Sequence, residues 1–363
     1  MLLEEGRIIR DVYEIDRFLG EGAFAEVYRV KHKFLGRQAM KVFKSPSLSL
    51  QEVEQKLGEA VILSRIGHPN IIRVFDAGIL DTKAGNCGYF TMEYVAGGNL
   101  ETFWQSHKSS LIPISDTMEI VKQVCTGLAV AHAEQPPVVH RDIKPQNILV
   151  GYDPGGLRIR IADFGLAKHV NPLTLLASAA GTPAFKPPEF VTNYDSCAGD
   201  VWAIGVTLYL LLTDRLPFPV LDLIDFSTGK CWSRPLIPAS RFNVQANAQL
   251  DSILARALAL KSLDRYPNAM TMLCDLTSWK AGETQDLSDR DSSADEHKSA
   301  LHSQLRSGSP SAEKLLKNAL ELSHDTSRLM EAADLMEEAL TNSPELREEY
   351  EYQLKLWRRG IML

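Results

Sequence analysis

The most informative part of the chain is His140-Arg141-Asp142-Ile143-Lys144-Pro145-Gln146-Asn147, which Asp163-Phe164-Gly165 follows about twenty residues later. Asp142 supplies a carboxylate that can accept or orient a hydroxyl proton, and Lys144 supplies a positive charge beside it. Asn147 and Asp163 offer the hard oxygen ligands that suit Mg²⁺. Transfer of a phosphoryl group needs a positioned hydroxyl, metal ions and charge neutralisation, and little covalent chemistry. The two strings in this order therefore indicate a phosphoryl-transfer site.

Two weaker signals precede this stretch. Gly20-Glu21-Gly22-Ala23-Phe24-Ala25-Glu26-Val27 lies between two runs of strand character, and its glycines allow backbone N–H groups to approach a phosphate chain. A tight hairpin turn would look the same. Ala39-Met40-Lys41 then places a lysine at the end of a strand, where a carboxylate has to hold its flexible stem. Glu59, on a segment of helical periodicity over 51–66, is the candidate partner.

Composition limits the class of protein. The chain has 363 residues, 45% of them hydrophobic and 23% charged, as in soluble globular proteins. Its net charge of −7 argues against nucleic acid as the main partner. The five cysteines form no CxxC pair, and the longest apolar run, Val201–Thr213, is too short to span a bilayer. We therefore expect a cytoplasmic protein that is not anchored in a membrane.

The order of the elements predicts an α+β protein of two lobes. Short strands dominate the first ninety or so residues, and helices follow, including one that Ser115 or Asp116 would cap. Residues 281–311 are rich in Ser, Asp and Gly, which predicts a flexible linker. Residues 312–363 return to helical periodicity.

Taken together, these residues resemble the signature set of the protein kinase family, over about residues 10–280. The resemblance implies the bilobal kinase fold, with a β-rich N-lobe over about 10–92 and a helical C-lobe over about 93–280. A short all-α extension over 312–363 would follow. The spacing around 233–277 resembles the bacterial-type serine/threonine kinases.

The resemblance also implies roles for single residues, with ATP as phosphoryl donor and Mg²⁺ as metal. Asp142 would be the catalytic base, with Lys144, Asn147 and Thr182 beside it, and Asn147 and Asp163 would bind Mg²⁺. Lys41 would pair with Glu59, Met92 would be the gatekeeper, and Glu93-Tyr94-Val95 the hinge that meets adenine. The residues implied to contact nucleotide are Leu19, Gly20, Glu21, Gly22, Ala23, Phe24, Ala25, Val27, Ala39, Lys41, Glu59, Met92, Glu93, Val95, Leu149 and Asp163.

Three structural interactions are implied in the same way. Asp200 resembles the buried anchor of the large central helix. Arg265 resembles the arginine that pairs with the activation-segment glutamate, here Glu189. His140 and Phe164 would stack with Leu63 and Val74 across the lobes.

Lys144 and Gly181-Thr182-Pro183 resemble the pattern of kinases that act on serine or threonine of a protein substrate, although dual specificity stays open. Ala25, Phe185 and Pro187 depart from the commonest family pattern and remove no charge or metal ligand. In the family, the arginine at the position of Arg141 usually meets a phosphate on the activation loop. Ser178, and after it Thr174, is the candidate for autophosphorylation; the alternative is a loop that is active without phosphate.

The C-terminal segment resembles one tetratricopeptide repeat, because Ala332, Ala339 and Pro344 stand at the spacing of that repeat. An ordinary helical hairpin explains the pattern about as well. A single repeat cannot bury its own apolar face, so it should pack on the kinase lobes, on a second copy or on a protein partner.

Two other functions were weighed. A pseudokinase scaffold that recruits partners through its tail would ordinarily lack Lys41, Asp142 or Asp163, and all three are present. A kinase for small molecules would lack the Gly-Thr-Pro … Pro-Glu activation segment, which this chain has. Both are disfavoured.

Overall fold

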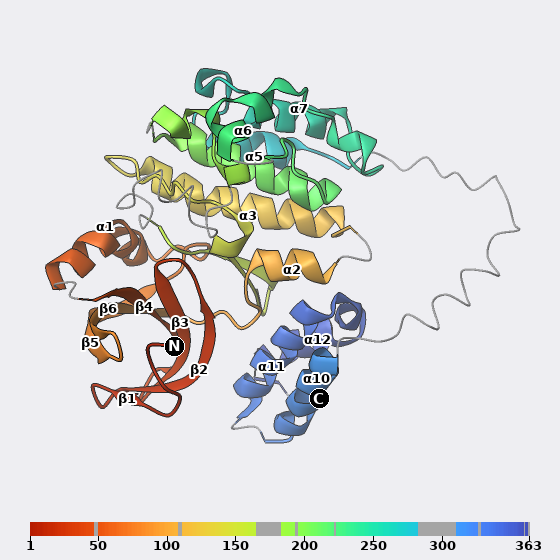
Figure 1. The fold of residues 1–363 in the computed structure, drawn as a ribbon. Helices are drawn as coiled ribbons and strands as arrows, with labels where there is room; N and C mark the ends of the chain where they lie inside the picture. Colours follow the sequence, from red (N-terminus) through yellow and green to blue (C-terminus); the bar gives the residue numbers. More distant parts are fainter. Residues whose placement is uncertain are drawn as a thin grey trace, which may run out of the picture.

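The structure, a computed structural model, describes residues 1–46, 50–107, 111–164, 183–192, 195–220, 223–281, 310–325, 328–358 and 360–361. The predicted linker, apart from its two ends, and most of the activation segment therefore lie outside the described residues. Figure 1 shows two lobes and, beside them, a group of C-terminal helices.

A six-stranded antiparallel sheet forms the N-lobe, in the order β1-β2-β3-β4-β6-β5. Alternation along β2 places Tyr13 and Ile15 in the core of this lobe, as the two-residue period of a strand requires. Helix α1 packs beside β5. The elements are β1 (Ile8–Ile9), β2 (Tyr13–Glu21), β3 (Ala25–His32), β4 (Gly36–Pro46), α1 (Leu50–Ile66), β5 (Val74–Thr82) and β6 (Gly85–Glu93).

The C-lobe is built around two helices, α3 (Ile114–Ala133) and α5 (Cys197–Thr213), which pack on each other. Almost every residue of α5 is buried, as expected of a helix that is apolar on all sides. A two-stranded hairpin carries the catalytic segments on its flanks. The remaining elements are α2 (Leu100–Ser106), β7 (Ile148–Asp153), β8 (Gly156–Ile161), α6 (Leu223–Ser227), α7 (Ala248–Ala257) and α8 (Ala269–Ser278).

The residues described between 310 and 358 form three α-helices, α10 (Pro310–Ser323), α11 (Leu329–Asn342) and α12 (Arg347–Arg358). They enclose an apolar core of their own, in which Ala332, Met336 and Trp357 are buried. Tyr152 of β7 belongs to the same core, so the helices pack on the C-lobe. We call residues 310–358 the tail.

The bilobal α+β fold is confirmed, but one detail of the prediction is wrong. Neither Ser115 nor Asp116 caps α3; the helix begins at Ile114 with Pro113 as N-cap and no side-chain cap hydrogen bond. Asp116 instead accepts a hydrogen bond from Arg347 of the tail. Among the helices that the structure describes, none combines the length and the apolar character that crossing a bilayer requires.

Candidate active site

The carboxylate of Asp142 lies at the centre of the site. Lys144 Nζ is 2.8 Å from its Oδ2, and Lys186 Nζ is 2.6 Å from its Oδ1. Asn147 Nδ2 donates to the same Oδ2 (3.0 Å) and to the backbone carbonyl of Asp142 (2.8 Å). Burial by itself would raise the pKa of Asp142, but the ammonium groups of Lys186 and Lys144 outweigh it and hold the pKa well below its usual range. The carboxylate is therefore ionised and fixed in one orientation.

The backbone before Asp142 is held by Asp200 at the start of α5. Asp200 is buried and accepts hydrogen bonds from the backbone N–H groups of His140 (2.7 Å) and Arg141 (2.9 Å) and from His132 Nε2 (3.0 Å). These bonds permit the left-handed backbone of Arg141, whose φ is 70°. Asp200 thus lies where the resemblance to kinases implied an anchor.

His140 links this loop to the Asp163 segment. Its ring is fully buried, which lowers its pKa, and its Nε2 donates to the carbonyl of Ala162 (2.8 Å). Its Nδ1 accepts from the backbone N–H of Asp142 (3.2 Å), so the ring is neutral. The rings of His140 and Phe164 are in edge contact, with centroids 4.5 Å apart.

Lys41 of the N-lobe reaches Asp163 of the C-lobe, with Nζ 2.6 Å from Oδ1. Asp163 has a φ of 67°, a rare backbone conformation for a residue other than glycine. The contact shows that the two lobes are arranged so that Lys41 and Asp163 meet across the boundary between them. The predicted partner of Lys41, Glu59, lies on α1, and its side chain is outside the described part of the structure.

An apolar cluster lies next to these charges and includes the residues predicted to enclose adenine. Ala39 and Met92 are buried in it, and Val27, Val95 and Leu149 pack against it with part of their surface exposed. They come from three N-lobe strands, from the connection after β6 and from β7, so both lobes contribute. A flat apolar ring is the kind of ligand that such a lining fits.

The remaining predicted nucleotide residues are in the N-lobe hairpin and at the end of its sheet. Leu19, Gly20 and Glu21 end β2, and Ala25 begins β3. Gly22, Ala23 and Phe24 form the turn between them, closed by a bond from Gly22 N–H to the carbonyl of Ala25 (2.8 Å). Glu93 ends β6 and pairs with Arg160 (2.9 Å). Thr182, with Ser178 and Thr174, lies outside the described residues.

Arg265 and Glu189 form the ion pair that the resemblance implied. The two guanidinium nitrogens of Arg265 meet the two carboxylate oxygens of Glu189 at 2.7 and 2.8 Å. This pairing fixes the end of the activation segment on the C-lobe core.

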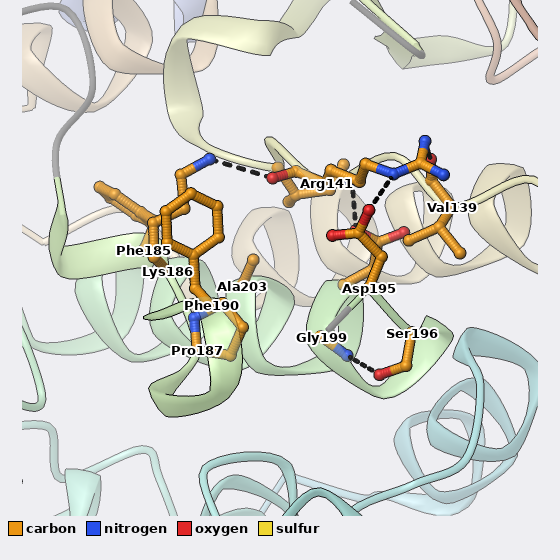
Figure 2. A pocket seen from close by; sticks show the side chains of 12 residues that line it. Val139, Arg141, Phe185, Lys186, Pro187, Phe190, Asp195, Ser196, Gly199 and Ala203 are labelled. Atoms are coloured by element: carbon orange, nitrogen blue, oxygen red, sulfur yellow. Dashed lines mark hydrogen bonds and ion pairs between the residues drawn. The ribbon is translucent and has the colours of Figure 1, made fainter. Parts of the chain in front are cut away.

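Lys186 is a site residue that the sequence analysis missed. Its ammonium also donates to the backbone carbonyl of Arg141 (3.0 Å), and Figure 2 shows it pointing at this oxygen while the guanidinium of Arg141 meets Asp195 (2.7 Å). The pocket that these residues line contains none of the predicted catalytic or nucleotide residues. The signal available in the sequence was a lysine directly before Pro187-Pro188-Glu189, where Pro187 departs from the commonest family pattern.

A β-sheet lobe and a helical lobe that bring a lysine, two aspartates and an asparagine together define the class of the protein kinases. The sequence profile of the family described as "Protein kinase domain" matches residues 13–350. The chain therefore belongs to the protein kinase family.

The proteins that this chain resembles are themselves named as kinases. The chain is 30% identical to "Serine/threonine-protein kinase PknB" of Mycobacterium leprae over 285 residues, 76% of this chain and 44% of that protein. It is 33% identical to "Serine/threonine-protein kinase ATG1c" of Arabidopsis thaliana over 216 residues, 59% of this chain and 28% of that protein. The crystal structure of the Mycobacterium tuberculosis PknI kinase domain superposes with a TM-score of 0.55 at 27% identity, covering 76% of this chain and 98% of that one.

These curated relatives are longer proteins. The chain spans less than half of the length of those it matches, with 28% for the Arabidopsis protein and 44% for the mycobacterial one. The similarity is thus one of kinase domains.

Proposed function

We propose that the chain is a serine/threonine protein kinase, which transfers the γ-phosphoryl group of ATP to a hydroxyl of a protein substrate. One observation carries the proposal: Lys41 of one lobe meets Asp163 of the other at 2.6 Å, beside a carboxylate, Asp142, that two lysines hold ionised. A scaffold without catalysis has no need of this arrangement of charges.

Asp142 is proposed as the base that orients the acceptor hydroxyl and receives its proton. Its low pKa suits the first task more than the second, because a weakly basic carboxylate takes up a proton only late in the transfer. Lys144, 2.8 Å from Asp142, is proposed to stabilise the negative charge of the phosphoryl group during its transfer. Lys41 is proposed to hold the phosphates of ATP.

Asn147 and Asp163 are proposed as ligands of Mg²⁺. Asn147 uses its amide nitrogen on Asp142, so its amide oxygen is the atom that suits a cation. Among the described residues, no group of three or more His, Cys, Asp or Glu side chains could form a metal site. A protein site of two oxygen ligands completed by phosphate oxygens is what Mg²⁺ ordinarily takes, and the ion supplies charge neutralisation there when bound.

Serine or threonine is the proposed acceptor, on the resemblance of Lys144 and Gly181-Thr182-Pro183 and on the names of the relatives. Autophosphorylation at Ser178, or at Thr174, is proposed as well. Arg141 already meets Asp195, so a phosphate on Ser178 or Thr174 would replace or extend this contact.

The cytoplasm is the proposed location. All five cysteines are free, which fits a reducing compartment where ATP is abundant.

The test is incubation of the purified chain with radiolabelled ATP and Mg²⁺, followed by mapping of the labelled residues. Asp142→Asn should lower the rate by about 10²–10⁴. Asp251→Asn is the control for the same substitution outside the site, because Asp251 accepts hydrogen bonds from the backbone N–H and the hydroxyl of Ser240. Label on serine or threonine that is lost only in Asp142→Asn supports the proposal. ATP binding without any label would refute it and favour the scaffold function.

A further inference from the structure

The tail lies against both lobes and against the segment that connects them. This connection runs from the end of β6 at Glu93 to the start of α2 at Leu100. Figure 1 shows α11 and α12 beside the N-lobe strands and below α2. Each of the three contacts has its own polar bonds.

The contact with the connection is made by Glu337 of α11. Its Oε1 accepts a hydrogen bond from the backbone N–H of Gly97 (3.0 Å), and its Oε2 meets the guanidinium of Arg358. Glu337 is only 2% exposed, and a buried carboxylate is tolerated only with such partners. The approach is close: a Cβ on Gly97 would lie 2.4 Å from the carbonyl of Val150 and 2.9 Å from Thr341 Oγ1.

The contact with the N-lobe consists of ion pairs from two strands. Arg37, at the start of β4, meets Asp334 (2.8 Å) and Glu331 (3.0 Å). Arg17 of β2 meets Glu338 at 2.9 Å. The N-lobe therefore supplies the cations and the tail the anions.

The contact with the C-lobe combines a charge with apolar packing. Arg347 meets Asp116 of α3 at 2.7 Å, and its guanidinium lies over the ring of Tyr152, 5.5 Å from the centroid. Tyr152 is buried in the apolar core of the tail. A rotation of one lobe against the other would have to break at least one of these sets of contacts.

We propose that residues 329–358 brace the connection between the lobes, and that Glu337 is a positioning residue for the nucleotide site, acting through Gly97 on the hinge at Glu93–Val95. The inference rests on the proposed function, since it takes the hinge as the adenine contact. The braced arrangement is the one in which Lys41 meets Asp163. Loosening the brace lets the lobes leave this arrangement and weakens nucleotide binding.

The experiment uses the full chain and a non-hydrolysable ATP analogue with Mg²⁺, titrated by calorimetry. Arg37→Gln removes two of the N-lobe ion pairs, and because the Arg37 side chain is partly exposed at 23%, the fold should persist. We expect its Kd for the analogue to rise about five-fold or more, within the usual range of coupling between sites. The KM for ATP should rise likewise, with kcat at saturating ATP within two-fold of wild type.

Lys317→Gln is the matched control. Like Arg37→Gln it removes one positive charge, here from the tail, but Lys317 pairs with Glu321 of its own helix and touches neither lobe through that pair. Glu337→Gln is the second variant; it keeps an oxygen for Gly97 and loses the charge opposite Arg358. Hydrogen exchange of the backbone amides over 94–100 measures the brace independently of nucleotide, and it should speed up in Arg37→Gln and Glu337→Gln alone.

An unchanged Kd together with unchanged exchange in both variants would overturn the inference, and so would an equal loss of affinity in Lys317→Gln. If the wild-type chain bound no nucleotide, the proposed function would fail and the nucleotide part of the inference with it. Exchange over 94–100 would still decide whether the tail braces the connection.

Discussion

Replacement of Arg265 by leucine tests the ion pair that fixes the activation segment. The side chain of Arg265 has no exposed surface, and both of its terminal nitrogens reach Glu189. It also donates to the backbone carbonyls of Ala259 (2.7 Å), Leu260 (3.0 Å) and Ala198 (3.2 Å). Arg265→Leu removes all of these donors at once while it keeps much of the apolar volume.

The expected loss of stability is about 3–5 kcal/mol, the usual cost of breaking a buried pair by removing one partner. Glu189, 16% exposed, is left as a largely buried anion, and three carbonyls lose a donor. For a chain of this size, roughly 2 °C of Tm corresponds to 1 kcal/mol, so Tm should fall by about 6–10 °C.

The assay is thermal unfolding of Arg265→Leu, Glu189→Leu and the double variant. Since the double variant leaves no buried charge unpaired, it should be more stable than the sum of the single losses predicts, by about 1–3 kcal/mol. Arg256→Leu is the control, because Arg256 is half exposed and 3.6 Å from Asp275, and it should cost about 1 kcal/mol or less. Strict additivity, or a fall in Tm equal to that of the control, would refute the reasoning.

Three further outcomes are expected. Burial would raise the pKa of Asp200, but its hydrogen bonds from His132 and the loop lower it, so its contribution to stability is present above about pH 4 and is lost as the pH falls through the folded pKa. The free energy of unfolding, measured with urea from about pH 2 to 5, should therefore depend less steeply on pH in Asp200→Asn than in wild type, and equal slopes would contradict this. Gly97→Ala should lose about 1–3 kcal/mol by thermal unfolding, because its Cβ meets a backbone carbonyl at 2.4 Å, whereas Gly58→Ala, with nothing within 4 Å, should lose none. Trp357→Ala removes a side chain that is only 1% exposed, so the free energy of unfolding by denaturant should fall by about 3–5 kcal/mol. A loss under about 1 kcal/mol would mean that the apolar core of the tail does not unfold together with the kinase lobes.

The catalytic segment could be predicted from the sequence because its functional groups lie within eight consecutive residues, 140–147. Lys144 and Asn147 each contact Asp142 directly, so their spacing along the chain already fixes which groups meet. The fold class followed for a similar reason, since strand and helix periods are local properties. The resemblance to kinases then supplied the distant pairing of Arg265 with Glu189.

Contacts that the local pattern does not encode could not be predicted. Lys186 meets Asp142 across 44 positions of the chain, and a lone lysine in a loop carries no sign of it. Asp116 looked like a cap because aspartate is among the favoured N-cap residues, yet it lies in the first turn and its partner Arg347 is 231 positions away. The tail helices showed an apolar face in the sequence, but only the structure shows that they bury it against one another and against Tyr152 of the C-lobe.

The charges of the tail explain why it docks in one orientation. Toward the N-lobe the tail presents acids, which meet Arg17 and Arg37; toward the C-lobe it presents a cation, Arg347, which meets Asp116. A tail turned end to end would place like charges opposite each other at both lobes, which costs energy and excludes that arrangement. Because the two polarities are opposite, the ion pairs select the register that brings Glu337 to Gly97, while the apolar core that includes Tyr152 holds the tail on the C-lobe without regard to charge.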